Sequence, residues 1–376
     1  MVKRWDLAIV GAGIMGLAHA VQASKAGLSV AVFERSSRAL GASVQNFGML
    51  AIAAQAPGRQ LRDARRALAD WQEIAPQSGI GMVPSGCLFL AREPEEMSVL
   101  EEFCQSASLS GHNAELLTRD GLNRHAADLC SKNLLGGLWS PDAWKVDQRQ
   151  AMAKIADWLQ RERGVSMHFS TEVRVVDPPL VETSIGSFKA DHVIICGGDE
   201  FDALFPDSFR ATGVTTCQLQ MLRTHPQSGG WRLQPFILGG LSITRYSAFA
   251  SCPSLPGLKE LQKRKHGPHL EHGIHVIACQ EADGSVTIGD SHSYGEGLSS
   301  ERSEEIDRLI LDELAAMISL PKPHIAERWL GRYAHLPEDE ALRLTPADGV
   351  TAVTMTNGQG MTHAFAVAAD VVSHLM

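Results

Sequence analysis

The sequence has little cysteine, and its few cysteines show no regular spacing. Seven cysteines occur among 376 residues, and no two of them form a C-x-x-C pair. Disulfide frameworks and cysteine zinc sites both depend on such spacing, so both are excluded. We therefore expect reduced thiols that are mostly buried as small apolar side chains, and we expect no metal site.

An excess of positive charge is also missing. The formal net charge is −9 and the isoelectric point is about 5.9, which argues against nucleic acid as a partner. One basic segment, LQKRKHGPH at Leu261–His269, lacks the interleaved aromatic residues of a nucleic-acid surface. We interpret this segment as a solvated loop.

Long apolar runs are absent as well. No stretch reaches the roughly 20 apolar residues that a membrane-spanning helix needs. The N-terminus imitates a signal peptide, with a basic start and an apolar run up to Ala18-His19-Ala20, but Asp6 and three glycines interrupt that run. We therefore expect a cytoplasmic protein without a membrane span, and no feature of the sequence indicates its oligomeric state.

The patterns that are present favour two domains, each assembled from separated pieces of chain. A chain of 376 residues is long enough for two cores. Helical patterns occupy residues 17–25, 59–74, 147–163 and 300–319, and strand patterns occupy 7–10, 28–33, 82–91, 165–176, 190–198 and 349–355. Between residues 214 and 288, the short runs TTCQLQMLRT, LSITRYSAF, HGIHVIACQ and GSVTIGD alternate with proline and glycine turns, as in an antiparallel sheet.

A glycine motif lies near the N-terminus, between a predicted strand and a predicted helix. Gly11, Gly13 and Gly16 form G-x-G-x-x-G, which allows a tight turn and close approach of a diphosphate to the helix start. Glu34 ends the following strand, where a carboxylate can bind a ribose hydroxyl. An acid at that place disfavours a 2′-phosphate, so the motif indicates FAD or NAD.

A second glycine turn opens a helix near the C-terminus. In TMTNGQGMTHAFAVAADVV, Gly358 and Gly360 stand between a short apolar run and a helical run. The start of a helix offers free N–H donors and the positive end of its dipole, so this turn is expected to hold something anionic. A glycine-initiated packing helix is the alternative.

These two motifs resemble the D-amino-acid oxidase superfamily of flavoproteins, in particular its glycine oxidase and sarcosine oxidase branch. DLAIVGAGIMGLAHAVQASKAGLSVAVFER is similar to the family's N-terminal FAD signature, and NGQGMTHAFAVAADV is similar to its C-terminal helix start. ADHVIICGG and GSVTIGDSHSYG resemble later strands, so the resemblance covers nearly the whole chain in order. It implies an α/β fold (α+β overall): a Rossmann-like FAD-binding domain from residues 1–81, 146–208 and 321–376, and a mainly antiparallel-sheet substrate domain from 82–145 and 209–320.

The resemblance also implies which residues lie around FAD. The C-terminal turn would face the pyrimidine end of the isoalloxazine ring, where backbone N–H donors stabilise negative charge. GASVQNFGML at Gly41–Leu50 would pass beside the ring, unless it is a polar surface turn. Sarcosine oxidases attach FAD through a cysteine near the C-terminal segment, but no cysteine follows Cys279, so noncovalent FAD is implied. The implied cofactor residues are Gly11, Gly13, Ile14, Met15, Gly16, Glu34, Arg35, Ser43, Gln45, Asn46, Gly48, Val173, Gly197, Gly198, Gly358, Gly360, Met361 and Thr362.

Four further residues are candidates for the substrate side. His292 in IGDSH and Tyr246 in SITRYSAF match places where the family has residues that line the substrate, although a structural histidine is equally compatible. If SITRYSAF is a strand, Arg245 points away from Tyr246. In WLGRYAH, Tyr333 aligns with an arginine that binds the substrate carboxylate in glycine oxidases, while Arg332 is one residue away and is either that anchor or a surface ion pair.

The implied function is FAD-dependent oxidation of a small amine by hydride transfer, with hydrolysis of the resulting imine and O2 as acceptor. Relatives have a second cationic anchor, an arginine or lysine, in the segment that corresponds to NGQGMTH, and this chain has neither residue there. The identity of the anionic group on the substrate is therefore left open. QNFGM and RWLGRYAH also resemble a bacterial subgroup associated with aminophosphonate breakdown, which adds aminoalkylphosphonates to amino acids and N-methyl amino acids. A dehydrogenase that passes electrons to a quinone or protein, and a non-catalytic dinucleotide-binding module, are the alternatives.

Overall fold

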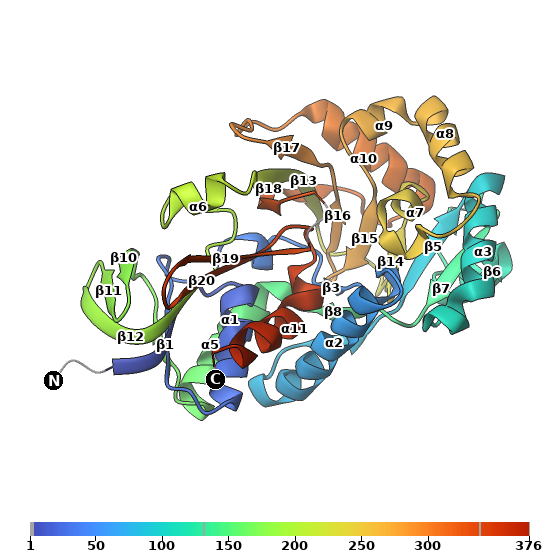
Figure 1. The fold of residues 1–376 in the computed structure, drawn as a ribbon. Helices are drawn as coiled ribbons and strands as arrows, with labels where there is room; N and C mark the ends of the chain where they lie inside the picture. Colours follow the sequence, from blue (N-terminus) through green and yellow to red (C-terminus); the bar gives the residue numbers. More distant parts are fainter. Residues whose placement is uncertain (1–3, 131, 338–339, 376) are drawn as a thin grey trace.

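The computed structural model describes residues 4–130, 132–337 and 340–375, which form two large sheets with helices packed on them (Figure 1). The first sheet runs in the order β10-β11-β12-β1-β2-β9, with β20 beside β12 and β19 beside β20. Its strands are β1 (Arg4–Val10), β2 (Val30–Phe33), β9 (Ser166–His168), β10 (Val173–Asp177), β11 (Leu180–Thr183), β12 (Gly186–Ile195), β19 (Ala341–Ala347) and β20 (Val350–Met355).

The centre of the first sheet is a βαβ unit. β1 is parallel to both β2 and β12, and α1 (Ile14–Lys25) connects β1 to β2. Parallel strands covered on both faces are apolar along their whole length, as Leu7, Ile9 and Val32 illustrate because each is completely buried. The N-terminal glycine motif therefore lies at the carboxyl end of a central strand, where open α/β sheets bind ligands.

Four helices pack together against the first sheet. α2 (Arg59–Ser78), α5 (Gln148–Glu162) and α11 (Gly360–Ser373) surround α1, and Figure 1 shows them grouped below β19 and β20. The buried indole N–H of Trp71 donates to the carbonyl of Met361 at 2.9 Å, so α2 fixes the first turn of α11. Residues from the two ends of the chain thus share one hydrophobic core.

The second sheet runs β17-β13-β16-β15-β14-β5-β7-β6, with β18 along the other side of β13. Its strands are β5 (Cys87–Ala91), β6 (Glu115–Thr118), β7 (Gly136–Ser140), β13 (Thr215–Thr224), β14 (Phe236–Leu238), β15 (Ile277–Gln280), β16 (Val286–Gly289), β17 (Ser293–Gly295) and β18 (Ile325–His335). All its pairings are antiparallel except β5 with β14. A small third sheet contains β3 (Met49–Leu50), β8 (Trp144–Val146) and β4 (Met82–Pro84).

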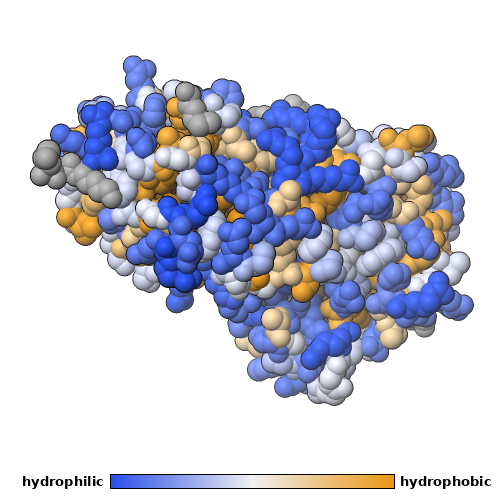
Figure 2. Space-filling model, turned by 90° about the horizontal axis from the view of Figure 1, so that it is seen from below, coloured by the Kyte–Doolittle hydropathy of each residue, from blue (hydrophilic) through white to orange (hydrophobic). Residues whose placement is uncertain are grey.

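The remaining helices are mostly short. They are α3 (Pro94–Ser110), α4 (Arg119–His125), α6 (Pro206–Arg210), α7 (Leu241–Arg245), α8 (Leu255–Lys265), α9 (Gly267–Glu271) and α10 (Glu304–Met317), with 3-10 turns η1 (Ala42–Val44), η2 (Ile52–Ala54) and η3 (Ser247–Phe249). No described helix is both long enough and apolar enough to cross a membrane. Figure 2 shows a face on which hydrophilic side chains predominate and hydrophobic ones are scattered among them.

The predicted fold class is confirmed, and four segments differ from the sequence pattern. LSITRYSAF forms α7 and η3 instead of a strand, and the basic Leu261–His269 segment lies in α8 and α9 instead of a loop. Residues 82–91 form two strands separated at Ser85 and Gly86. β18 belongs to the second sheet, although the sequence placed the return to the first domain at residue 321. Short apolar runs do not by themselves distinguish strand from helix, which explains the first difference.

Candidate functional site

Both glycine motifs line one cavity of about 630 Å³ between the two sheets. Gly13 at the start of α1 and Gly360 at the start of α11 both contribute to its wall. Arg245, Tyr246 and His292, from the chain between β14 and β17, contribute to the same wall. A volume of this size is typical of a cofactor or ligand site.

The N-terminal turn has no room for side chains at two of its glycines. A Cβ on Gly11 would lie 2.4 Å from the carbonyl oxygen of Cys196, and a Cβ on Gly16 would lie 1.9 Å from the carbonyl oxygen of Gly11. Gly11 also has a φ of +101°, which favours glycine. The N-cap residue of α1, Gly13, has no side chain to cap the helix, so the start of α1 can face an anion, apart from the Ile14 N–H, which a nearby hydroxyl accepts.

Glu34 stabilises this turn from the end of β2. Its carboxylate accepts the backbone N–H of Ala12 at 3.0 Å and the N–H of Ser36 at 2.9 Å. The Ser43 hydroxyl accepts the N–H of Ile14 at 2.9 Å, which brings the Gly41–Leu50 segment against the start of α1. The guanidinium of Arg35, beside it, pairs with Glu200 at 2.7 Å, and this ion pair raises the pKa of Arg35. These contacts could hold the nucleotide end of a dinucleotide.

The C-terminal turn faces the other part of the cavity. Gly358 has a φ of +74°, and a Cβ there would lie 3.1 Å from Cζ of Tyr333, so the ring of Tyr333 packs directly on this turn. α11 begins at Gly360 after Gln359, which provides no side-chain cap. Backbone N–H groups and the helix dipole therefore point to a place where negative charge would be stabilised.

Arg245, Tyr246 and Tyr333 line another part of the cavity wall. Arg245 is the last residue of α7, and its side chain projects into the cavity. The side chain is exposed there, although protein atoms surround it on its other sides. Desolvation opposes its charge, but the neighbouring hydroxyls of Tyr294 and Tyr333 and the carboxylate of Asp290 outweigh this effect and raise its pKa. Burial raises the pKa of both Tyr246 and Tyr333, so their hydroxyls stay protonated. Arg245 forms no ion pair among the described residues, which leaves its charge available to an anion.

Arg332 and Tyr333 occupy opposite faces of β18. Alternation along the strand places Tyr333 toward the cavity interior, where it pairs with Cys217 of β13. Arg332 donates to Asp199 at 3.1 Å, and its side chain is 51% exposed at the rim. The side chain in contact with the C-terminal turn is therefore that of Tyr333.

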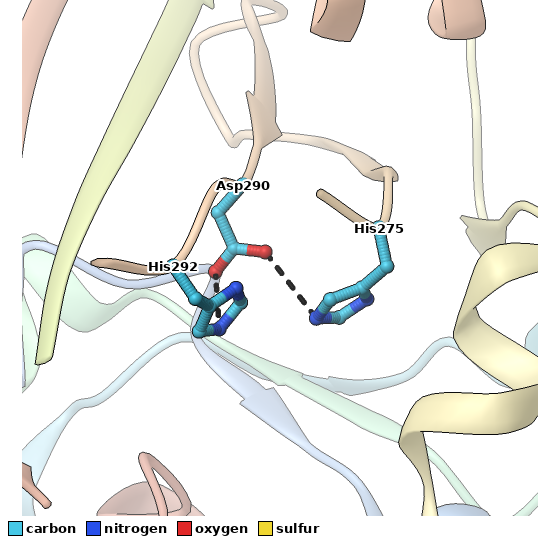
Figure 3. Close-up of side chains that lie close together, drawn as sticks. All are labelled: His275, Asp290 and His292. Atoms are coloured by element: carbon cyan, nitrogen blue, oxygen red, sulfur yellow. Dashed lines mark ion pairs between the residues drawn. The ribbon is translucent and has the colours of Figure 1, made fainter. Parts of the chain in front are cut away.

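Three buried side chains cluster next to Arg245: His275, Asp290 and His292 (Figure 3). Burial raises the pKa of Asp290 to about 7, and the positive charge of Arg245 offsets part of this effect. Burial, together with Arg245, lowers the pKa of His275 to about 3 and holds that of His292 well below its usual value. Both imidazoles are consequently neutral at pH 7, with lone pairs available.

The structure brings most of the predicted residues to the cavity. Three of them do not line it. Gly16 packs against Gly11 and β1, and Gly48 lies against the Val146 carbonyl. The Thr362 hydroxyl accepts the N–H of Ala51 at 3.0 Å. The predicted residues that line it are Gly11, Gly13, Ile14, Met15, Glu34, Arg35, Ser43, Gln45, Asn46, Val173, Gly197, Gly198, Tyr246, His292, Arg332, Tyr333, Gly358, Gly360 and Met361.

Sequence reasoning missed Arg245, His275 and Asp290. Arg245 was dismissed because a strand would have turned it away from Tyr246, whereas the helix α7 ends between the two residues and both reach the cavity. The sequence signal for a short helix was the pair Gly239-Gly240, which directly precedes the five residues of α7. His275 and Asp290 carried no signal, because only strand pairing brings them together.

Comparison with known proteins gives one matching family and several similar proteins. The family described as DAO, FAD dependent oxidoreductase, matches residues 6–374. Glycine oxidase of Geobacillus kaustophilus (strain HTA426) is 28% identical over 210 residues, which are 53% of this chain and 55% of that protein. The match thus spans about half the length of this relative.

Solved structures are similar over almost the whole chain. Glycine oxidase from Bacillus cereus ATCC 14579 has a TM-score of 0.77 at 16% identity, covering 99% of this chain and 94% of that one. L-proline dehydrogenase from P. horikoshii has a TM-score of 0.72 at 17% identity, covering 99% and 93%. At such identities these likenesses establish the fold.

Proposed function

Because the chain belongs to the DAO family of FAD dependent oxidoreductases, we propose that it oxidises the C–N bond of a small amine that carries an anionic group. The family resemblance noticed in the sequence is thereby confirmed, and FAD is the cofactor of this family. The observation that carries the proposal is Arg245, a cation without a carboxylate partner among the described residues, in the same cavity as the start of α11. Glycine oxidase, the curated relative, is named for an anionic amine of this kind.

The cavity residues fit FAD. Gly11, Gly13 and the start of α1 would hold the diphosphate, since a Cβ at Gly11 would overlap the Cys196 carbonyl and the positive end of the α1 dipole lies at this turn. Glu34 would bind the ribose, and the turn from Gly358 to Met361 would lie against the flavin ring. When bound, FAD accepts a hydride from the carbon next to the substrate nitrogen.

The protein residues would orient the amine and keep it neutral. Arg245 binds the anionic end of the substrate, which fixes the distance of the amine from the C-terminal turn. The Tyr246 and Tyr333 hydroxyls remain protonated and can donate to or accept from the substrate. Oxidation of the C–N bond gives an imine, which water hydrolyses to a carbonyl compound and an amine. We propose O2 as the electron acceptor.

Comparison of substrates assigns the anionic group, because a guanidinium binds both carboxylate and phosphonate through two parallel hydrogen bonds. The candidate classes are amino acids, N-methyl amino acids and N-substituted aminoalkylphosphonates. The phosphonate carries more charge than a carboxylate, and Arg245 lies beside two tyrosine hydroxyls that can bind a third oxygen. We therefore propose aminoalkylphosphonates as the preferred class.

Anaerobic mixing of the purified yellow protein with a panel of amines tests this function. We expect an anionic amine to bleach the flavin absorbance, and an uncharged amine of the same size to bleach it far more slowly. Admission of air should restore the colour and release hydrogen peroxide. Bleaching by no member of the three classes contradicts the amine assignment, while bleaching without peroxide, but with reduction of an artificial quinone, indicates a dehydrogenase.

Paired substitutions on β18 test which side chain faces the substrate. Tyr333→Phe removes a hydroxyl inside the cavity and is expected to lower kcat/KM about tenfold, the effect of one hydrogen bond of about 1 to 1.5 kcal/mol. Arg332→Gln removes only a rim ion pair and is expected to change kcat/KM by less than about threefold. Steady-state kinetics with the best amine of the panel gives both values, and the reverse ranking would show that Arg332 is the anchor.

A further inference from the structure

Strand pairing brings His275, Asp290 and His292 together from two segments of the second sheet. β15 and β16 are antiparallel, and the pairing continues beyond them because His275 and Asp290 exchange backbone hydrogen bonds of 3.2 and 3.1 Å. His292 follows two residues later, where its N–H donates to the carbonyl of His272 at 2.9 Å. All three side chains line the cavity, and Figure 3 shows both imidazoles directed at the carboxylate.

His292 contributes no proton to its contact with Asp290. Nδ1 of His292 lies 2.9 Å from the carbonyl oxygen of Gly273, which only accepts, so Nδ1 carries the proton and Nε2 carries the lone pair. That lone pair faces Oδ2 of Asp290 at 3.8 Å. Oδ1 of Asp290 is buried, finds no hydrogen-bond donor among the described residues, and lies 3.4 Å from Nε2 of His275.

Ligand atoms arranged in this way can coordinate a cation placed between them. The separations of 3.4 and 3.8 Å are longer than the usual N–H···O bond, so hydrogen bonding does not account for them. Bonds of about 2.0 to 2.1 Å to zinc place two ligands of a tetrahedron about 3.4 Å apart. The ligand atoms of all three residues lie within 4.8 Å of one another.

We propose that His275, Asp290 and His292 bind a divalent transition-metal ion of the Zn²⁺ type, with an open coordination position toward the cavity. Two imidazole nitrogens and one carboxylate oxygen are a ligand set that zinc favours, whereas Mg²⁺ and Ca²⁺ require mostly oxygen. The hydrogen bond from Nδ1 of His292 to the Gly273 carbonyl and the 3.2 Å contact of His275 Nδ1 with the Ser242 hydroxyl orient both rings from behind, as outer contacts do at metal sites.

The open position would bind the anionic group of the substrate together with Arg245, a step that rests on the proposed function. A metal dication, one carboxylate and the nearby guanidinium leave a net charge of about +2, which complements a phosphonate dianion. The anion also separates two cations that would otherwise repel each other. Metal and anionic ligand should therefore strengthen each other's binding.

Metal analysis of the untagged FAD-loaded protein tests the site without relying on catalysis. After removal of bound metal with a chelator, calorimetric titration with Zn²⁺ should give about one equivalent per chain. His275→Gln, Asp290→Asn and His292→Gln should each weaken Zn²⁺ binding by about 100-fold or more. His335→Gln is the matched control, because His335 lines the same cavity outside the cluster and should leave Zn²⁺ affinity unchanged.

The outcomes separate this site from the proposed function. Retained flavin absorbance and an unchanged melting temperature show that each variant is folded. Wild-type protein that binds no more Zn²⁺ than the Asp290→Asn variant overturns the metal site, even if anionic amines bleach the flavin. A protein that binds Zn²⁺ but is bleached by no amine keeps the metal site and overturns the function. Equal Zn²⁺ affinity with and without methylphosphonate overturns the open position toward the cavity.

Discussion

Replacing Arg245 with methionine is expected to lower kcat/KM for an anionic amine by about 30- to 1,000-fold, the effect of losing about 2 to 4 kcal/mol of charged contact. The physical reason is that Arg245 projects into the cavity and forms no ion pair among the described residues, so its guanidinium can pair with the anion of the substrate. Methionine keeps most of the side-chain length and apolar contact. Steady-state kinetics over a range of substrate concentrations measures the loss.

Two controls give this result a specific meaning. Arg245→Lys keeps the charge but not the two parallel N–H donors, so it should recover only part of the lost kcat/KM. An uncharged amine should be oxidised equally slowly by wild type and Arg245→Met, because no anion is available for Arg245 to bind. An equal loss for charged and uncharged amines would mean that Arg245 supports the cavity wall instead of binding the substrate anion.

The part of the cavity that we propose holds the nucleotide was readable from the sequence because its signals are local. Gly11, Gly13 and Glu34 belong to one βαβ unit, where spacing alone sets the geometry. The C-terminal turn at Gly358 was likewise a local glycine pattern before a helix. Sequence spacing could not show that the two turns meet in one cavity, because their meeting depends on the packing of α1, α2 and α11 into a shared core.

The opposite wall of the site was less readable, because it depends on tertiary contacts. Arg245 reaches the cavity only because LSITR is a helical turn, and five residues carry too little periodicity to distinguish helix from strand. His275 and Asp290 are 15 positions apart and meet through the pairing of β15 with β16. Cysteine spacing, the basis for expecting no metal, is uninformative about ligands that are histidine and aspartate.

The largest effect on the cofactor is expected from Gly13→Leu. Gly13 has φ −71° and ψ 179°, a conformation open to any residue, and a Cβ there would meet only the Ser43 hydroxyl at 3.1 Å. The leucine side chain would therefore enter the cavity where the diphosphate is proposed to bind, without straining the backbone. Loss of the diphosphate contacts, about 3 kcal/mol or more, should weaken FAD binding roughly 100-fold or more and give a colourless protein.

Gly257→Leu is the matched control, because Gly257 lies in α8, has open space around its Cβ position and does not line the cavity. This variant should retain FAD at the wild-type ratio of flavin to protein absorbance. Far-ultraviolet circular dichroism should show both variants folded. Gly13 is the N-cap residue of α1, and leucine at such a position costs a helix only about 1 kcal/mol. A folded, fully yellow Gly13→Leu protein would place the diphosphate elsewhere, because a leucine at position 13 and two phosphates at the start of α1 cannot share the same space.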